Sequence, residues 1–289
     1  SIFNKYRYYC SVVDGATGWT RMMPCHGETA NVAKACLAAF LAEARAIMRD
    51  TRPLAELRIM LVRTDQGAAF TSEAFVDFVE REVQAQWSPA CTYTAQQNST
   101  VERMWQRIFA NARVLLIMAK LPPSFHTYAV QTAVFIHNRM PSAWRNDSSP
   151  YMLLTNGAKA DMSHLRAFGC SAYVYMQEDA RSTYSNEDTH GPKLCDRAVQ
   201  GIYLGPDVRS PGHVVYLSGR KRVVVTARHV KFDEKTTPGV PSGGVTRWMT
   251  MTPPIETSSV TADGNGPDKR HKDGASVDAV PVETILPTS

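Results

Sequence analysis

The stretch LRIMLVRTDQGAAF at residues 57–70 combines two signals that together predict an α/β fold. Its first half is a short apolar run, consistent with a buried strand that ends at Asp65. Gly67 permits a sharp turn, and a helical pattern capped by Thr71 or Ser72 then continues to residue 84. A strand that ends in an aspartate and leads into a helix is typical of the site-bearing edge of an α/β sheet.

A second stretch, YTAQQNSTVERMW at residues 93–105, opens the longest helical pattern in the chain. Apolar residues recur every three or four positions from about 97 to 118, and the sequence LPP then stops the helix. Glu102 lies in the first turns of this helix. The same periodicity predicts helices over 28–49 and 125–140, so strands and helices alternate along the first half of the chain.

The N-terminal residues predict an antiparallel hairpin. YRYYCSVV at 6–13 and GWTRMMP at 18–24 are rich in β-branched and aromatic residues, and the DGATG between them has turn chemistry. Asp14 stands at the end of the first strand.

The second half of the chain changes character after residue 160. Short strand patterns at 172–176, 198–205, 213–217 and 222–232 are divided by polar turns, which is the cadence of a small antiparallel barrel. Beyond about residue 235 the chain is rich in Pro, Gly, Ser and Thr, and predicts a disordered tail. We therefore divide the chain into a core at 1–160, a barrel module at 161–234 and a disordered linker at 235–289.

Composition excludes several classes of protein. The six cysteines form no CxxC pair, which argues against a disulfide framework or a structural zinc site and favours an intracellular protein. No run of about 18 apolar residues is present, so no membrane partner is expected. KRHK at 269–272 has the composition of a nuclear-targeting patch, although a solvated basic stretch is the simpler interpretation.

Positive charge gathers just after Glu102. Residues 96–150 hold six basic side chains against two acidic ones, within a net charge of +5 for the chain. This location suits a phosphate backbone, while a solvated basic helix face is the alternative. The basic residues are Arg103, Arg107, Arg113, Lys120, Arg139 and Arg145.

Three carboxylates, Asp14, Asp65 and Glu102, stand at the predicted ends of strands and the start of a helix. Phosphoryl transfer by two metal ions needs hard oxygen ligands held close together, and Mg²⁺ prefers carboxylates and water. Each aspartate taken alone is more often a turn former or a helix cap. The three together predict a metal site.

The motifs resemble those of the integrases of copia-type long-terminal-repeat retrotransposons. SVVDGATGW, RTDQGAAF and YTAQQNSTVER are similar to the family's first Asp, second Asp and Glu segments, with 36 residues (66–101) between Asp65 and Glu102. HNRMPS, SPYMLL, SHLRAFGCSAYVY, GIYLG and ARHVKFDE follow in the family's order. The resemblance covers residues 3–234.

This resemblance implies an RNase H-like core, with a mixed five-stranded sheet and flanking helices, followed by a small SH3-like β-barrel. It also implies that Asp14, Asp65 and Glu102 hold two Mg²⁺ (or Mn²⁺) ions for 3′-end processing and strand transfer. The expected partner is DNA, bound by a homo-oligomer in the nucleus, and no small-molecule substrate is expected.

Polar and basic residues beside the carboxylates are candidates for DNA contacts, with an ordinary polar surface as the alternative. Two other functions stay open. A ribonuclease H shares the fold and the metal chemistry but normally has a fourth carboxylate. A catalytically inactive relic would only bind DNA or a partner, and Ala69 and Ser99 depart from the family's motifs. The candidate DNA contacts are Gln66, Gln97, Asn98, Arg103 and Arg107.

Overall fold

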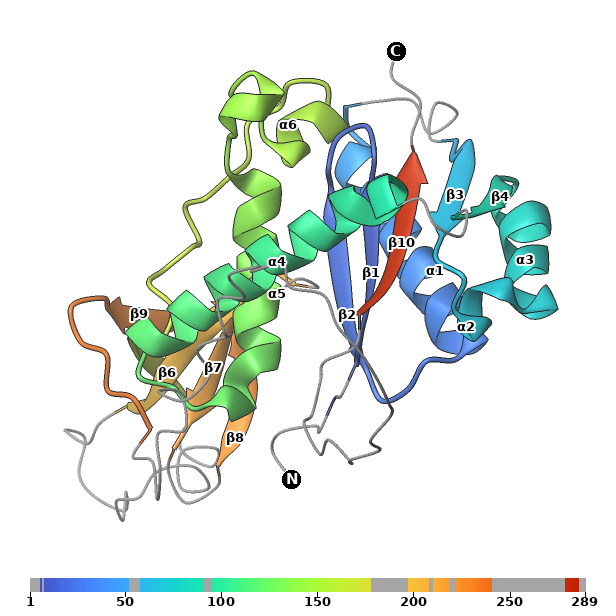
Figure 1. The fold of residues 1–289 in the computed structure, drawn as a ribbon. Helices are drawn as coiled ribbons and strands as arrows, with labels where there is room; N and C mark the ends of the chain where they lie inside the picture. The colour runs from blue at the N-terminus through green and yellow to red at the C-terminus, as the bar shows by residue number, and fades with distance from the viewer. Residues whose placement is uncertain are drawn as a thin grey trace, which may run out of the picture.

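The computed structural model places two five-stranded sheets side by side, joined by long helices (Figure 1). The first sheet has the strand order β2-β1-β10-β3-β4, and the second has the order β8-β7-β6-β5-β9. The structure describes residues 6, 8–51, 58–90, 95–177, 197–207, 210–218, 222–240 and 279–285.

The first sheet begins with the predicted hairpin. β1 (Tyr8–Asp14) and β2 (Thr20–Cys25) are antiparallel, and their register runs from Tyr8 opposite Cys25 to Val13 opposite Thr20. β1 alternates strictly between the two faces of the sheet. Cys10 and Val12 pack with one core cluster, whereas Tyr9 and Val13 pack with another. The sheet is therefore covered on both faces.

The second pair of strands in this sheet is parallel. β3 (Leu61–Thr64) pairs with β4 (Gln86–Pro89), and the chain between them is helical. The single helix expected over 72–84 is instead divided into α3 (Glu73–Asp77) and the π-helical η2 (Phe78–Val83), preceded by α2 (Ala68–Thr71). The wider π turn ends at Gln84, whose φ of 59° is left-handed.

The strand β10 (Ala279–Ile285) corrects the expectation of a wholly disordered tail. It lies at the centre of the first sheet, parallel to β1 and antiparallel to β3. Its sequence AVPVETI has the β-branched residues of a strand, but the polar residues before it hide that signal. The five-stranded mixed sheet was expected, but a strand contributed by residues 279–285 was not.

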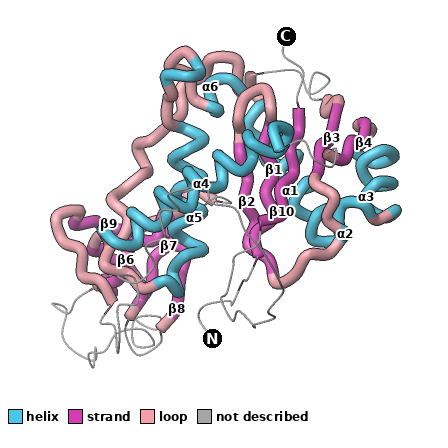
Figure 2. Tube along the Cα trace, in the orientation of Figure 1, coloured by secondary structure: helices cyan, strands magenta, loops and turns pink. Residues whose placement is uncertain are grey.

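Helices cover the two faces of the first sheet in a three-layer arrangement (Figure 2). α1 (Ala30–Met48), capped by the Thr29 side chain, packs on the face that carries Cys10 and Val12. α4 (Ala95–Met118) and α5 (His126–Arg139) pack on the other face. Phe125 of η3 (Pro123–Phe125) joins the same cluster, whereas Leu154 of α6 (Pro150–Leu154) packs with the cluster of α1. A third short helix, η4 (Ala143–Arg145), precedes α6.

The second sheet is antiparallel throughout and confirms the strand cadence of the module. Its middle strands β6 and β7 also pack against α4 and α5 through Ile202, Leu204 and Tyr216, so one core cluster joins the two sheets. Among the helices described, none is long and apolar enough to cross a membrane. The strands are β5 (Ser171–Tyr175), β6 (Ala198–Pro206), β7 (His213–Leu217), β8 (Val223–Ala227) and β9 (Val230–Asp233).

Candidate active site

Asp14 closes the turn between β1 and β2. Its side chain is fully buried, and its Oδ2 accepts hydrogen bonds from the Thr17 backbone N–H (2.9 Å) and the Thr17 hydroxyl (2.5 Å). Its backbone N–H donates to the carbonyl of Trp19, and its own carbonyl accepts from Gly18. Local bonds of this kind are the usual reason for an aspartate at the start of a turn.

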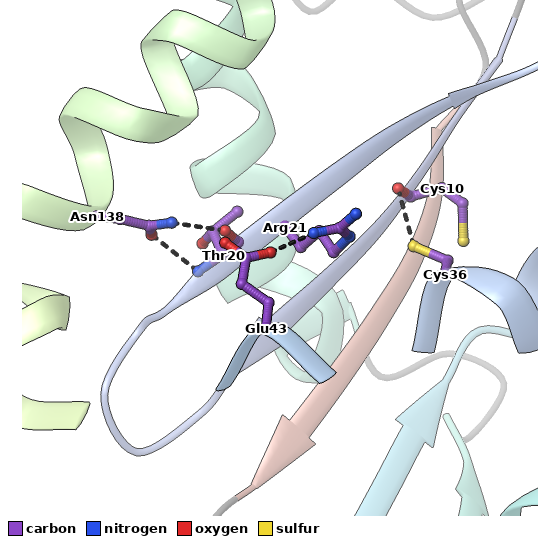
Figure 3. A network of polar contacts seen from close by, with 6 residues as sticks. All are labelled: Cys10, Thr20, Arg21, Cys36, Glu43 and Asn138. Atoms are coloured by element: carbon purple, nitrogen blue, oxygen red, sulfur yellow. Dashed lines mark hydrogen bonds and ion pairs between the residues drawn. The ribbon is translucent and has the colours of Figure 1, made fainter. Parts of the chain in front are cut away.

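Further contacts hold the same end of the hairpin (Figure 3). The Asn138 side chain accepts from the Thr20 backbone N–H at 2.9 Å and donates to the Thr20 carbonyl at 2.7 Å, which ties β2 to the end of α5. Arg21 pairs with Glu43 of α1. The hairpin is thereby fixed to helices on both faces of the sheet.

Asp65 follows β3 and is only half-buried. Its Oδ1 accepts a hydrogen bond from the Gly67 backbone N–H at 2.9 Å. Burial raises the pKa of its carboxyl group above the usual value, and the Gly67 bond opposes that shift. Partial desolvation of a carboxylate that solvent still reaches is typical of a functional position.

Glu102 is exposed on α4, and the helix beneath it is firmly seated. The Trp105 indole N–H donates to the Ser11 hydroxyl of β1 at 2.8 Å, with both groups buried. Trp105 also stacks on Phe109, which in turn meets the Tyr9 ring edge to face. These contacts fix the position of α4 one turn after Glu102.

The directions of the strands separate Asp14 from Asp65. β1 and β3 run in opposite directions, because β10 is parallel to the first and antiparallel to the second. Asp14 is therefore level with Thr284 and Val62, whereas Asp65 lies one residue beyond Thr64. With strands about 4.8 Å apart and about 3.3 Å per residue along a strand, the two Cα atoms are roughly 14 Å apart.

Electrostatic contacts agree with this placement. The pKa of the Cys10 thiol is raised chiefly by its hydrogen bond with Cys36 and by burial, with a smaller contribution from the charge of Asp65. Asp65 therefore lies beside the middle of β1, and Asp14 ends that strand.

The metal triad of Asp14, Asp65 and Glu102 stays a prediction. Among the residues that the structure describes, no group of three or more His, Cys, Asp or Glu side chains is placed to hold a metal ion. The Asp14 carboxylate accepts hydrogen bonds from Thr17 within its own turn. Asp65 and Glu102 do fit a divalent cation by chemistry, since both are hard oxygen donors that solvent reaches.

The candidate DNA contacts fall into three groups. The Gln66 side chain donates to the carbonyl of Ala90 at 3.0 Å, so it ties the loop after β3 to the end of β4. Arg103 and Arg107 are exposed on α4, one helical turn apart. The side chains of Gln97 and Asn98 lie outside the described residues.

Two basic residues lie near the β1–β2 turn, at a place that the sequence did not predict. The Arg145 guanidinium lies against Gly18, whose φ of +73° and lack of a side chain make room for it. His137 forms a hydrogen bond to the backbone of Gly18. His137 belongs to the HNRMPS segment and Arg145 to the basic group at 96–150, but no local pattern places them at this turn, because the contact depends on how α5 and η4 (Ala143–Arg145) meet the hairpin.

Comparisons with known proteins bear on the whole chain. Residues 170–244 match the retroviral polymerase SH3-like domain. The chain is 30% identical over 177 residues to the retrovirus-related Pol polyprotein from transposon TNT 1-94 of Nicotiana tabacum. The chain is related to retrotransposon Pol polyproteins. It is also 26% identical over 235 residues to the Pol polyprotein from transposon RE1 of Arabidopsis thaliana.

This Pol-related chain corresponds to a small part of those relatives. The matches take in 61% and 81% of the chain but only 12% and 14% of the two polyproteins. The similar solved structures include the HTLV-2 integrase catalytic core in complex with magnesium, with 22% identity and a TM-score of 0.37. That match covers 52% of this chain and 88% of the other.

Proposed function

We propose that this chain is the core of a retrotransposon integrase, a metal-dependent polynucleotidyl transferase that processes DNA 3′ ends and joins them to target DNA. The observation that carries the proposal is the half-buried Asp65, held at the end of β3 in a chain related to retrotransposon Pol polyproteins. Asp65 and Glu102 are the two carboxylates that we assign to the site.

Asp65 and Glu102 would hold the divalent cation, Mg²⁺ or Mn²⁺. When bound, such a cation activates the nucleophile and offsets charge that develops on the phosphorus. The Gly67 N–H orients the Asp65 carboxylate, and the bond between Trp105 and Ser11 keeps α4 in place. The triad predicted from the sequence adds Asp14 to this pair, and the Asp14→Asn variant separates the two assignments.

The remaining parts of the proposal concern partners. We assign DNA as the partner and a nuclear location, since integration takes place on DNA. A homo-oligomer is supported by an exposed apolar stripe on α4, where Val114, Ile117 and Met118 are 57%, 55% and 71% exposed. Such a stripe at helical spacing is suited to a protein contact.

The test is a disintegration assay on branched DNA with Mg²⁺ or Mn²⁺, comparing the chain with Asp65→Asn and Glu102→Gln. We expect the unsubstituted chain to reseal the DNA in the presence of metal, and both substitutions to abolish this activity. The Asp14→Asn variant should keep the activity when it is assayed below the melting temperature of that variant. Equal activity in the wild type and Glu102→Gln would reject that assignment.

A second candidate function, an inactive DNA-binding relic, is favoured by the absence of an assembled triad among the described side chains. A folded chain that binds DNA and never reseals it would establish this alternative.

A further inference from the structure

Three basic side chains from three different helices meet beside the turn between β1 and β2. The Arg145 guanidinium lies flat against Gly18 at the end of η4, and His137 of α5 bonds to the backbone of the same glycine. Arg107 of α4 is close enough to act electrostatically on both. α4 and η4 thus direct positive charge to one short turn, and α5 places His137 beside it.

The electrostatic effects of this cluster are consistent. Burial, and then the neighbouring charge of Arg107, lower the pKa of Arg145 to about 10. Burial, followed by the charge of Arg145 and in smaller part that of Arg107, lowers the pKa of His137 to about 4, so His137 is neutral at pH 7. Two like charges held together, one of them half-buried, create a strongly positive local potential.

We propose that Arg107 and Arg145 clamp one phosphate of the DNA backbone at the Gly18 turn. A guanidinium presents its donors in a planar fork that matches the oxygens of a phosphate. Gly18 makes this possible, because any side chain there would collide with Arg145. The inference deepens the proposed function, on which it rests for DNA as the ligand.

The clamp has a fixed relation to the candidate active site. Arg107 follows Glu102 by five residues on α4, which is about 7.5 Å along the helix axis. The clamp is at the Asp14 end of the hairpin, away from Asp65. A DNA strand held at the turn would therefore run along α4 toward Glu102.

The decisive experiment uses Arg107, which is exposed and so tolerates substitution. Binding of a random-sequence duplex is measured by fluorescence anisotropy, without metal, at several salt concentrations. We expect Arg107→Gln to weaken binding and to reduce the slope of log K against log salt by about one, and Arg107→Lys to restore the slope. The matched control is Arg81→Gln, because Arg81 is 78% exposed and pairs with Asp77 of α3. An Arg107→Gln slope equal to that of Arg81→Gln would overturn the clamp.

A second measurement tests the Arg145 side without altering Arg145. Sulfate is titrated at constant ionic strength against chloride, while NMR follows His137. An anion bound between the guanidiniums should raise the pKa of His137 from about 4 toward its usual value, and Arg107→Gln should diminish that response. An unchanged His137 pKa would count against the site. Both measurements are made without metal and without catalysis. They therefore test only the clamp, whereas the disintegration assay tests the assignment of Asp65 and Glu102.

Discussion

Asp14 and Asp65 look alike in the sequence and differ in the fold. Asp14 ends β1 and Asp65 directly follows β3 of the same sheet, and each precedes a glycine within two residues. Asp14 is fully buried and its carboxylate is bonded twice to Thr17, whereas Asp65 is half-buried with a raised pKa. One aspartate builds the fold, and the other is free to act on a ligand.

The largest expected effect is on catalysis at the Asp65 end. Asp65→Asn and Glu102→Gln should each lower the rate of strand transfer or disintegration by more than roughly 100-fold. Loss of a residue that only hydrogen-bonds to a metal ligand can already lower activity by about that factor, and loss of the ligand itself should lower it further. Asp14→Asn should leave the rate per folded molecule within a few-fold of wild type. Isothermal titration calorimetry with Mn²⁺ tests which carboxylates bind the metal. A loss of metal binding in Asp14→Asn would show that Asp14 is a ligand.

The next effect is on stability at the Asp14 end. Asp14→Ala leaves the buried Thr17 N–H and hydroxyl without their acceptor, which should lower the free energy of unfolding by about 1–3 kcal/mol. Urea unfolding followed by circular dichroism measures this. Thr17→Val, which removes only the hydroxyl donor, should cost less. An unchanged urea midpoint in Asp14→Ala would show that the turn does not depend on this carboxylate.

A smaller effect is expected where α4 meets β1. Ser11→Ala removes the acceptor of the Trp105 indole N–H and should cost about 1 kcal/mol of stability. Ser11→Ala should also leave the position of Glu102 less well fixed, so we expect a lower apparent affinity for Mn²⁺. If stability drops while metal affinity is unaffected, α4 does not need this bond to position Glu102.

The smallest effect depends on pH and concerns Asp65. The folded pKa of Asp65 is above its unfolded value of 3.8, so ionisation of this group opposes folding as pH rises through the folded pKa. Asp65→Asn should therefore slightly raise the melting temperature at pH 7 in chelator, with the gain vanishing below about pH 3.8. A lower melting temperature at pH 7 would mean that Asp65, like Asp14, supports the fold.

Local sequence predicted the parts of the fold that depend on local periodicity. The apolar spacing that ends in LPP identified α4 within two residues at its start, and strand patterns identified β5, β6 and β7. The single segment expected at 222–232 is divided into β8 and β9. β1 is buried on both faces, because it packs against α1 on one side and α4 on the other. The apolar run in the sequence of this strand agrees with that burial.

The site was predicted less well, because it depends on the direction of strands. Asp14 and Asp65 each end a strand, and the sequence shows no sign that β1 and β3 are antiparallel across β10. The contact of Arg145 with Gly18 was not predicted for a similar reason: the two residues are 127 apart in the chain. Periodicity reports which residues are buried, but not which distant residues meet.

The central position of β10 has a consequence for how the protein assembles. The β1–β2 pair and the β3–β4 pair are both local in sequence, but within the described sheet they are joined only through β10, which follows every other strand in the chain. Its pairing with β1 spans some 270 residues, the type of long loop closure that slows folding. Pro281, opposite Ser11, also offers no N–H to the ladder. During synthesis we therefore expect the β1–β2 and β3–β4 pairs to form first, and β10 to pair with β1 and β3 last.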